Sequence, residues 1–226
     1  MELKGKKIIF LGDSITEGAG ASSVEKRYTD LVAQKTGATV YNHGVGGTRI
    51  ANQKNKTADT YSELDFCVRA KNMEKDADII CVFGGTNDYG HGDAEIGEMS
   101  DRTNDTFYGA LHQLYTYLDE TYPFAQKIIM TPLHRCDEEN PLGDLIYYKN
   151  RGLPFRTNGA PLKTYVEIIR EVAEYYSFPV LDLFKNSGIQ PEVPVMKETF
   201  TVDGLHPNDA GYELISELVI SFLKTL

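Results

Sequence analysis

The segment Ile8-Ile9-Phe10-Leu11-Gly12-Asp13-Ser14-Ile15-Thr16 passes from an apolar run into a glycine and a row of mostly polar residues. Four consecutive apolar residues predict a strand that is buried on both of its faces. Such strands are typical of parallel sheets that helices cover on both sides. The segment therefore predicts an α/β fold in which Ser14 stands just beyond the carboxyl end of a central strand, where open parallel sheets gather their functional groups.

Short apolar runs continue to alternate with helical spacing along the whole chain. We expect strands at residues 8–11, 39–41, 78–83, 127–130 and 180–183, and helices at residues 24–36, 61–73, 106–122, 162–176 and from about 208. Repeated strand–helix units with right-handed crossovers predict a three-layer α/β/α sandwich around a five-stranded parallel sheet. A chain of 226 residues without a linker rich in Pro, Ser or Gly is expected to form one domain, residues 1–226.

Composition and charge exclude several classes of protein. Apolar residues make up 41% and charged residues 25%, as in ordinary globular proteins, so a disordered or fibrous chain is excluded. The net charge of −10 argues against binding to nucleic acid or to an anionic membrane surface over a wide area. Three scattered cysteines do not form a disulfide framework, and Cys81, inside an apolar run, is expected to be buried.

The amino-terminal sequence gives an expectation about location. The first residues are basic, but the apolar run after them ends at Leu11, which is too short for a signal-peptide core, and no stretch approaches the length of a membrane span. We expect a cytoplasmic protein, although secretion of a processed form stays open. The oligomeric state is not indicated by the sequence.

Three expected strands are followed by segments that are candidates for a site. Ser14 lies on the tight turn after the first strand, where a nearby helix start would point free N–H groups at a developing negative charge. After the second strand, residues 42–48 contain three glycines, which permit a close approach of the backbone to a ligand. Asn87 follows the third strand. Taken singly, the Ser14 segment is equally well interpreted as an ordinary turn with a capping residue, and the segments after the second and third strands are better interpreted as ordinary turns.

A fourth segment, Asp203-Gly204-Leu205-His206-Pro207, precedes the last expected helix. An aspartate three residues before a histidine can hold the imidazole Nδ1–H, which leaves Nε2 as an acceptor for the proton of a nucleophile. The other interpretation is a helix-start turn with a surface histidine. For the remaining histidines we expect routine solvent or packing roles; they are His43, His91, His112 and His134.

No metal or cofactor is expected. Residues 134–139 (His-Arg-Cys-Asp-Glu-Glu) come nearest to a ligand cluster, but they are better interpreted as an exposed charged loop. Together, the serine, the carboxylate-oriented histidine and the donors on two further loops supply the complete set of roles for nucleophilic catalysis.

The four segments resemble the motif blocks of the SGNH (GDSL-type) hydrolases, and they occur in the order of that family over nearly the whole chain. The resemblance implies a flavodoxin-like sandwich and a serine esterase activity. It implies that Ser14 is the nucleophile, His206 the general acid and base, and Asp203 the residue that orients His206. It further implies an oxyanion hole formed by the backbone N–H groups of Ser14 and Gly47 and the side-chain amide of Asn87; the adjacent Gly46 is the alternative to Gly47.

The substrate is expected to be a small-molecule ester, and we expect Asp13, Tyr89 and Arg135 to contact it. Residues 132–161 form a long, polar and Tyr-rich stretch after the fourth strand, which suits a sugar or another polar alcohol better than a long acyl chain; a role in covering the sheet edge or in a subunit contact is equally compatible. We therefore favour a short-acyl esterase, for example a carbohydrate deacetylase. The alternatives are a lysophospholipase or thioesterase, a non-catalytic binding protein and a flavodoxin-like electron carrier.

Overall fold

The computed structural model describes residues 1–54, 65–144, 149–150 and 159–226. Its centre is a parallel sheet of five strands in the order β2-β1-β3-β4-β5. The strands are β1 (Lys7–Gly12), β2 (Thr39–Gly44), β3 (Ile79–Phe83), β4 (Gln126–Met130) and β5 (Val180–Leu181). The predicted five-stranded parallel sheet is therefore confirmed.

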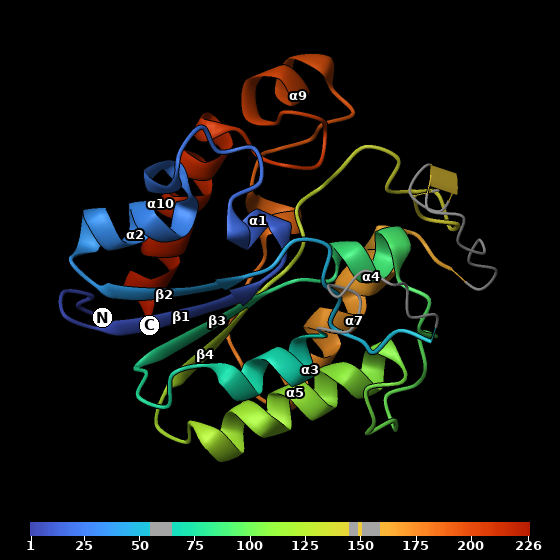
Figure 1. The fold of residues 1–226 in the computed structure, drawn as a ribbon, viewed down its shortest axis with the longest axis horizontal. Helices are drawn as coiled ribbons and strands as arrows, with labels where there is room; N and C mark the ends of the chain where they lie inside the picture. The colour runs from blue at the N-terminus through green and yellow to red at the C-terminus, as the bar shows by residue number, and fades with distance from the viewer. Residues whose placement is uncertain (55–64, 145–148, 151–158) are drawn as a thin grey trace.

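Helices cover both faces of this sheet (Figure 1). They are α1 (Ser14–Glu17), η1 (Val24–Lys26), α2 (Tyr28–Thr36), α3 (Phe66–Arg69), η3 (Ala70–Asn72), α4 (Thr86–His91), α5 (Phe107–Thr121), α7 (Leu162–Tyr175), α8 (Leu183–Asn186), α9 (Pro194–Phe200) and α10 (Asp209–Thr225). Helices α2 and α10 lie on one face, and α3, α5 and α7 lie on the other. This arrangement is the predicted three-layer sandwich.

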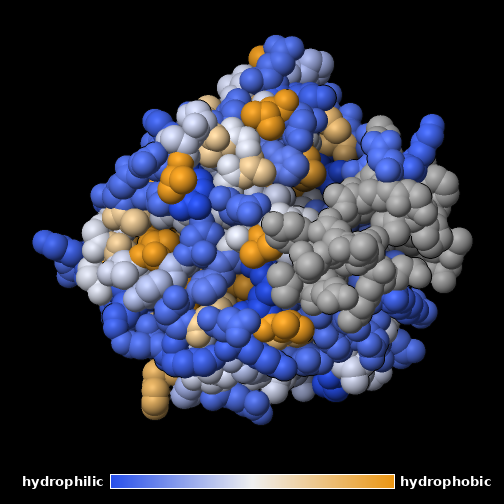
Figure 2. Space-filling model, viewed as in Figure 1, coloured by the Kyte–Doolittle hydropathy of each residue, from blue (hydrophilic) through white to orange (hydrophobic). Residues whose placement is uncertain are grey.

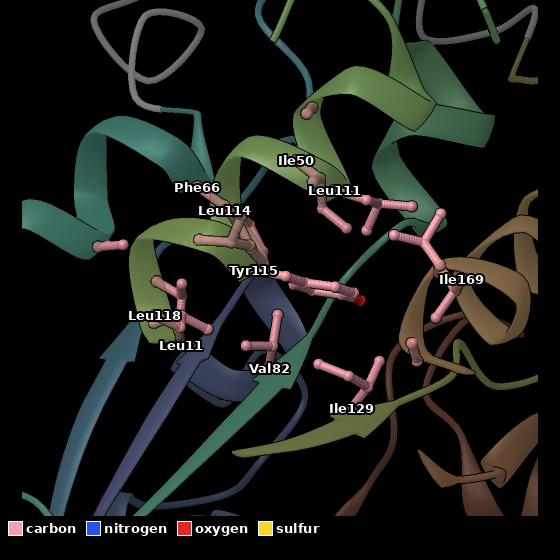
Figure 3. Packing of buried hydrophobic residues seen from close by; sticks show 14 of the residues in the cluster. Leu11, Ile50, Phe66, Val82, Leu111, Leu114, Tyr115, Leu118, Ile129 and Ile169 are labelled. Atoms are coloured by element: carbon pink, nitrogen blue, oxygen red, sulfur yellow. The ribbon is translucent and has the colours of Figure 1, made fainter. Parts of the chain in front are cut away.

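Alternate residues of the strands form two separate cores, because successive side chains of a strand point to opposite faces. Ile8 and Phe10 of β1 pack into the core beneath α2 and α10. Ile9 and Leu11 pack on the opposite side, against residues of α3, α5 and α7. Figure 3 shows this second core, in which Leu11 and Val82 of the sheet face Leu114 of α5. Burial on both faces explains why β3 and residues 8–11 of β1 are apolar throughout.

Several element boundaries differ from the prediction. The helix expected at residues 24–36 is interrupted at Arg27, whose extended backbone (φ −64°, ψ 144°) separates η1 from α2. Strand β5 has only two residues because Asp182 caps α8, accepting a hydrogen bond from the backbone N–H of Lys185. Helices α4 and α9 were not expected, and residues 61–64 of the helix expected at 61–73 lie outside the described residues.

The strand register places three loop starts side by side. Gly12, the last residue of β1, is paired with Gly44 of β2 on one side and with Phe83 of β3 on the other. Because β1 lies between these two strands, the segments that follow all three of them begin at one edge of the sheet. Ser14, Gly47 and Asn87 are on those segments.

Candidate active site

Ser14 is the first residue of α1 and follows β1 after only one intervening residue. That residue, Asp13, is the N-cap of the helix: its carboxylate accepts a hydrogen bond of 2.9 Å from the backbone N–H of Ile15. Gly44 of β2 packs directly beneath this turn, and a Cβ atom there would lie 2.0 Å from the backbone nitrogen of Glu17. The turn is therefore held rigidly, and the Ser14 side chain is half-buried.

The side chains of Ser14, His206 and Asp203 form one hydrogen-bonded chain. Ser14 Oγ lies 3.1 Å from His206 Nε2, and His206 Nδ1 lies 2.7 Å from Asp203 Oδ2. Because a carboxylate only accepts, Nδ1 carries the proton and Nε2 accepts the hydrogen bond that the Ser14 hydroxyl donates. This is the arrangement in which a histidine can remove the proton of a nucleophilic serine.

The loop between α9 and α10 fixes the histidine in place. Thr201 and Pro207 form an antiparallel bridge, and the backbone N–H of Val202 donates to the carbonyl of His206 at 2.9 Å. Partial burial alone would raise the pKa of Asp203, but the hydrogen bonds that it accepts from the ring and backbone of His206 and from the backbone of Leu205 outweigh burial. They hold its pKa well below the ordinary range, so Asp203 remains a carboxylate.

The glycine loop after β2 offers one free backbone donor and one that is occupied. Glu17 Oε2 accepts a hydrogen bond of 3.0 Å from the N–H of Gly46. Within the described ranges, no acceptor is found for the N–H of Gly47 or of Ser14. Gly47 has a φ of +74°, which glycine adopts without strain, and a Cβ there would meet nothing within 4 Å. This geometry favours Gly47 over Gly46 as a donor to a developing oxyanion.

Asn87 lies on the short helix α4, where it is buried. Its Nδ2 donates to the carbonyl of Thr48 at 3.0 Å, and its Oδ1 lies 3.1 Å from His91 Nε2. An amide nitrogen has two N–H groups, so the contact with Thr48 leaves one for a ligand. Asn87 is thus joined to the same loop that carries Gly47.

Two buried charged residues that the sequence analysis did not single out hold these loops. Arg69 donates to the carbonyl of Gly12 at 2.9 Å, to Thr48 Oγ1 at 2.8 Å and to the carbonyl of His43. Asp88 accepts from the backbone N–H groups of Ile50 and Ala51 at 2.9 Å each. Asp88 directly follows Asn87 in the sequence, but no local signal marks Arg69, because its partners come from β1, β2 and the loop after β2.

The three residues expected to contact the substrate occupy two different environments. Asp13 is buried beneath the serine, and burial raises its pKa to about 6. Tyr89 and Arg135 line a cavity of about 670 Å³ that Asp203 and Leu205 border on the side of the loop between α9 and α10. The Arg135 guanidinium lies 5.4 Å from the centre of the Tyr89 ring and 3.8 Å from Asp144. Asp13 is not part of this cavity wall.

The remaining histidines do not share one role. His43 pairs with Glu74 and His134 with Glu138, each at 2.7 Å, and buried His112 lies 3.0 Å from the hydroxyl of Tyr176. His91 differs from these three in its partner, because its Nε2 lies 3.1 Å from Oδ1 of the Asn87 amide. Nothing in the sequence around His91 distinguishes it, since the contact depends on the unexpected helix α4.

Among the residues that the structure describes, no group of three or more His, Cys, Asp and Glu side chains is arranged to hold a metal ion. The described helices also include none that is long and apolar enough to cross a membrane. Cys81 is buried, as expected from its apolar surroundings.

This chain was compared with protein families, with curated proteins and with solved structures, and the matches found agree with this geometry. A model of the GDSL-like Lipase/Acylhydrolase family matches residues 10–214. A solved protein from Lactobacillus plantarum is 30% identical, with a TM-score of 0.81 over 98% of each chain. None of the curated proteins compared with this sequence matches it.

Two more distant structures share the fold. A carbohydrate acetylesterase family member from Sinorhizobium meliloti is 16% identical, with a TM-score of 0.63 over 97% of this chain and 98% of its own. An acetyl xylan esterase is 22% identical, with a TM-score of 0.60 over 96% of this chain and 99% of its own.

Proposed function

Since the chain belongs to the GDSL-like lipase/acylhydrolase family, we propose that it is a serine ester hydrolase acting on short-acyl esters such as acetylated carbohydrates. The observation that carries the proposal is the continuous chain from Ser14 Oγ through His206 to Asp203, with distances of 3.1 and 2.7 Å. It is supported by the location, on the loops around Ser14, of one side-chain amide and of two backbone N–H groups that have no acceptor among the described residues.

In the proposed mechanism, His206 Nε2 takes the hydroxyl proton as Ser14 Oγ attacks the ester carbonyl carbon. The carbonyl oxygen becomes an oxyanion, which accepts hydrogen bonds from the N–H groups of Ser14 and Gly47 and from the Asn87 amide. His206 then gives its proton to the oxygen of the leaving alcohol, and the acyl group stays on Ser14. A water molecule, deprotonated by His206, attacks this acyl-enzyme and releases the acid.

A polar alcohol is the leaving group that suits the surroundings best. The cavity beside Asp203 and Leu205 is lined by the polar side chains of Arg135, Asn140 and Tyr89. On the face shown in Figure 2, apolar residues of the described part lie in separate small patches between hydrophilic ones. A long acyl chain needs a contiguous apolar surface, so the polar side chains that line this cavity support a short acyl group on a sugar-like alcohol, as the names of the two acetylesterase-like structures suggest.

Hydrolysis of p-nitrophenyl acetate, butyrate, octanoate and palmitate, together with acetate release from acetylated xylo-oligosaccharides, tests the proposal. We expect the highest kcat/KM on acetate and a loss of turnover in Ser14→Ala. Ser100→Ala, which alters an exposed serine, is the matched control and should keep full activity. A maximum at octanoate or palmitate would replace the short-acyl assignment with a lysophospholipase- or thioesterase-like one.

Labelling with a fluorophosphonate distinguishes an enzyme with a narrow substrate range from a protein that only binds. An activated Ser14 reacts with the probe even when every ester in the panel is a poor substrate. Absence of both turnover and Ser14-dependent labelling would overturn the assignment as a serine hydrolase.

A further inference from the structure

A closed set of hydrogen bonds connects the two separate donors of the proposed oxyanion hole. Arg49 Nη1 donates to the carbonyl of Gly47 at 3.1 Å and also lies 3.1 Å from His91 Nδ1. On the other side of the same imidazole ring, Nε2 lies 3.1 Å from Asn87 Oδ1. Asn87 Nδ2 in turn donates to the carbonyl of Thr48, the residue after Gly47. Arg49 is buried and His91 is half-buried.

The chemistry of the partners fixes every proton in this set. The Thr48 carbonyl only accepts, so it must face the Asn87 nitrogen, which turns Asn87 Oδ1 towards His91. His91 Nε2 must therefore carry a proton to donate to that oxygen. A guanidinium only donates, so His91 Nδ1 must present its lone pair to Arg49. The contacts are satisfied together only by a neutral His91 protonated on Nε2.

We infer that His91 and Arg49 are positioning residues that fix the Asn87 amide and Gly47 in the geometry needed to bind the oxyanion; this inference rests on the proposed esterase function. His91 sets the rotation of the Asn87 amide, so that its second N–H points away from His91 and Thr48. Arg49 donates both to the His91 ring and to the carbonyl of Gly47, so it connects the ring that sets this rotation with Gly47. The two donors, which come from different strand ends, are thereby held at a fixed separation.

We expect loss of this positioning to lower kcat, because it weakens an interaction made in the transition state. A preorganised donor stabilises the oxyanion because no reorganisation is needed when the charge develops. Loss of one donor costs about 10²–10³ in turnover, so a donor that is present but loosely oriented is expected to cost about 10- to 100-fold. KM should change little, because the ground-state ester carbonyl carries much less charge than the oxyanion.

A pair of substitutions separates this positioning role from simple packing. Glutamine carries an NH₂ donor group and a carbonyl acceptor at the end of its side chain, so it can replace both contacts of neutral histidine, whereas alanine has neither a donor nor an acceptor there. We expect His91→Ala to lower kcat on p-nitrophenyl acetate about 10- to 100-fold, and His91→Gln to restore it to within about fivefold of the wild type. Equal loss in both variants, or an effect of His91→Ala confined to KM, would overturn the inference.

A double-mutant cycle with Asn87 adds a second criterion. If His91 acts through the Asn87 amide, then His91→Ala should have less than about a twofold effect on kcat in an Asn87→Ala background. Full additivity of the two losses would show that His91 acts by another route. Wild-type turnover that depends on Ser14 establishes the esterase separately, so failure of the inference is distinguishable from failure of the proposed function.

The tautomer of His91 provides a readout on the wild-type protein that does not depend on activity. Long-range ¹⁵N–¹H correlation spectra of the wild-type protein should show His91 protonated on Nε2 alone at neutral pH, with the signal assigned by its loss in His91→Gln. Protonation on Nδ1, or on both nitrogens, is incompatible with the described contacts and would overturn the inference whatever the kinetics show.

Discussion

The carboxylate of Asp203 binds His206 twice: Oδ2 lies 2.7 Å from the ring Nδ1, and Oδ1 accepts from the backbone N–H of the same residue at 2.7 Å. One contact fixes the tautomer of the imidazole, and the other fixes the position of the backbone that carries it. The three-residue spacing between the two residues makes both contacts possible within one turn. Asp203 therefore controls both which nitrogen of His206 is protonated and where that nitrogen lies.

The substitution Asp203→Asn tests the control of the tautomer. The amide oxygen can still accept from the backbone of His206, but the amide nitrogen donates to the ring and so favours the wrong tautomer. We expect kcat on p-nitrophenyl acetate to fall by about 10⁴, because the wrong tautomer presents a donor instead of an acceptor to Ser14, with little change in thermal stability. A loss of less than tenfold would contradict the assigned role.

Asn87→Ala tests the proposed side-chain donor of the oxyanion hole. Removal of a donor that binds only the developing charge should reduce kcat by about 10²–10³ and leave KM nearly unchanged. Asn72→Ala, which alters an exposed asparagine of η3, serves as the matched control. Steady-state kinetics of both variants provide the check, and a change confined to KM would place Asn87 in substrate binding instead.

Local sequence patterns were sufficient to predict the strands of the sheet and the order in which the segments of the candidate site follow them. Buried strands appear as continuous apolar runs, so β1, β3 and β4 were located to within one residue at each end. Asp203 and His206 are three residues apart, and their contact needs only a short turn. Parallel pairing then brings the segments after β1, β2 and β3 together without further information.

Tertiary contacts between distant residues could not be predicted in the same way. The three acceptors of Arg69 lie 57, 21 and 26 residues away in the sequence, so its role depends on the assembled sheet edge. Helix α4 has six residues, one of them glycine, and five of the six are buried. Its formation depends on packing rather than on helical periodicity, and the contact between His91 and Asn87 was missed for the same reason.

Arg69→Lys should destabilise the whole protein. Lysine cannot reproduce a planar fork that donates to several acceptors, so backbone carbonyls near Gly12 and His43 would lose buried partners. We expect the free energy of unfolding in urea to fall by about 2–4 kcal/mol with an unchanged m-value. The exposed Arg102→Lys should cost less than about 0.5 kcal/mol, and an equal effect of the two changes would argue against a clamp at Arg69.

Arg135→Met tests the proposed pocket for a polar alcohol. Methionine keeps much of the volume of arginine but lacks its donors, so esters whose alcohol reaches the cavity should bind less well. We expect KM for acetylated xylo-oligosaccharides to rise about 5- to 20-fold, while kcat/KM for p-nitrophenyl acetate stays within about twofold. Equal effects on both substrates would remove Arg135 from the group of residues that determine specificity.

Asp88 should make stability decrease as the pH rises from about 4 to about 6. Its burial raises the pKa in the folded protein to about 6, although backbone hydrogen bonds from Ala51 and Ile50 oppose this shift. In the unfolded chain an ordinary aspartate loses its proton near pH 4. Between these values the folded state therefore binds more protons than the unfolded state, and the free energy of unfolding decreases with pH. Above about pH 6 both states are ionised and the effect is constant.

The comparison with Asp88→Asn isolates this contribution, since asparagine retains an acceptor for the N–H groups of Ile50 and Ala51 but does not titrate. The difference between the two proteins in free energy of unfolding should shift by about 2 kcal/mol against the wild type between pH 4 and pH 6.5, because each unit of pKa shift corresponds to about 1.4 kcal/mol and the unfolded chain is already partly ionised at pH 4. Urea denaturation at half-unit steps of pH measures it directly. A difference that does not vary with pH, or one that shifts in favour of the wild type, would mean that the Asp88 carboxylate is stabilised in its charged form by the loop that carries Gly47.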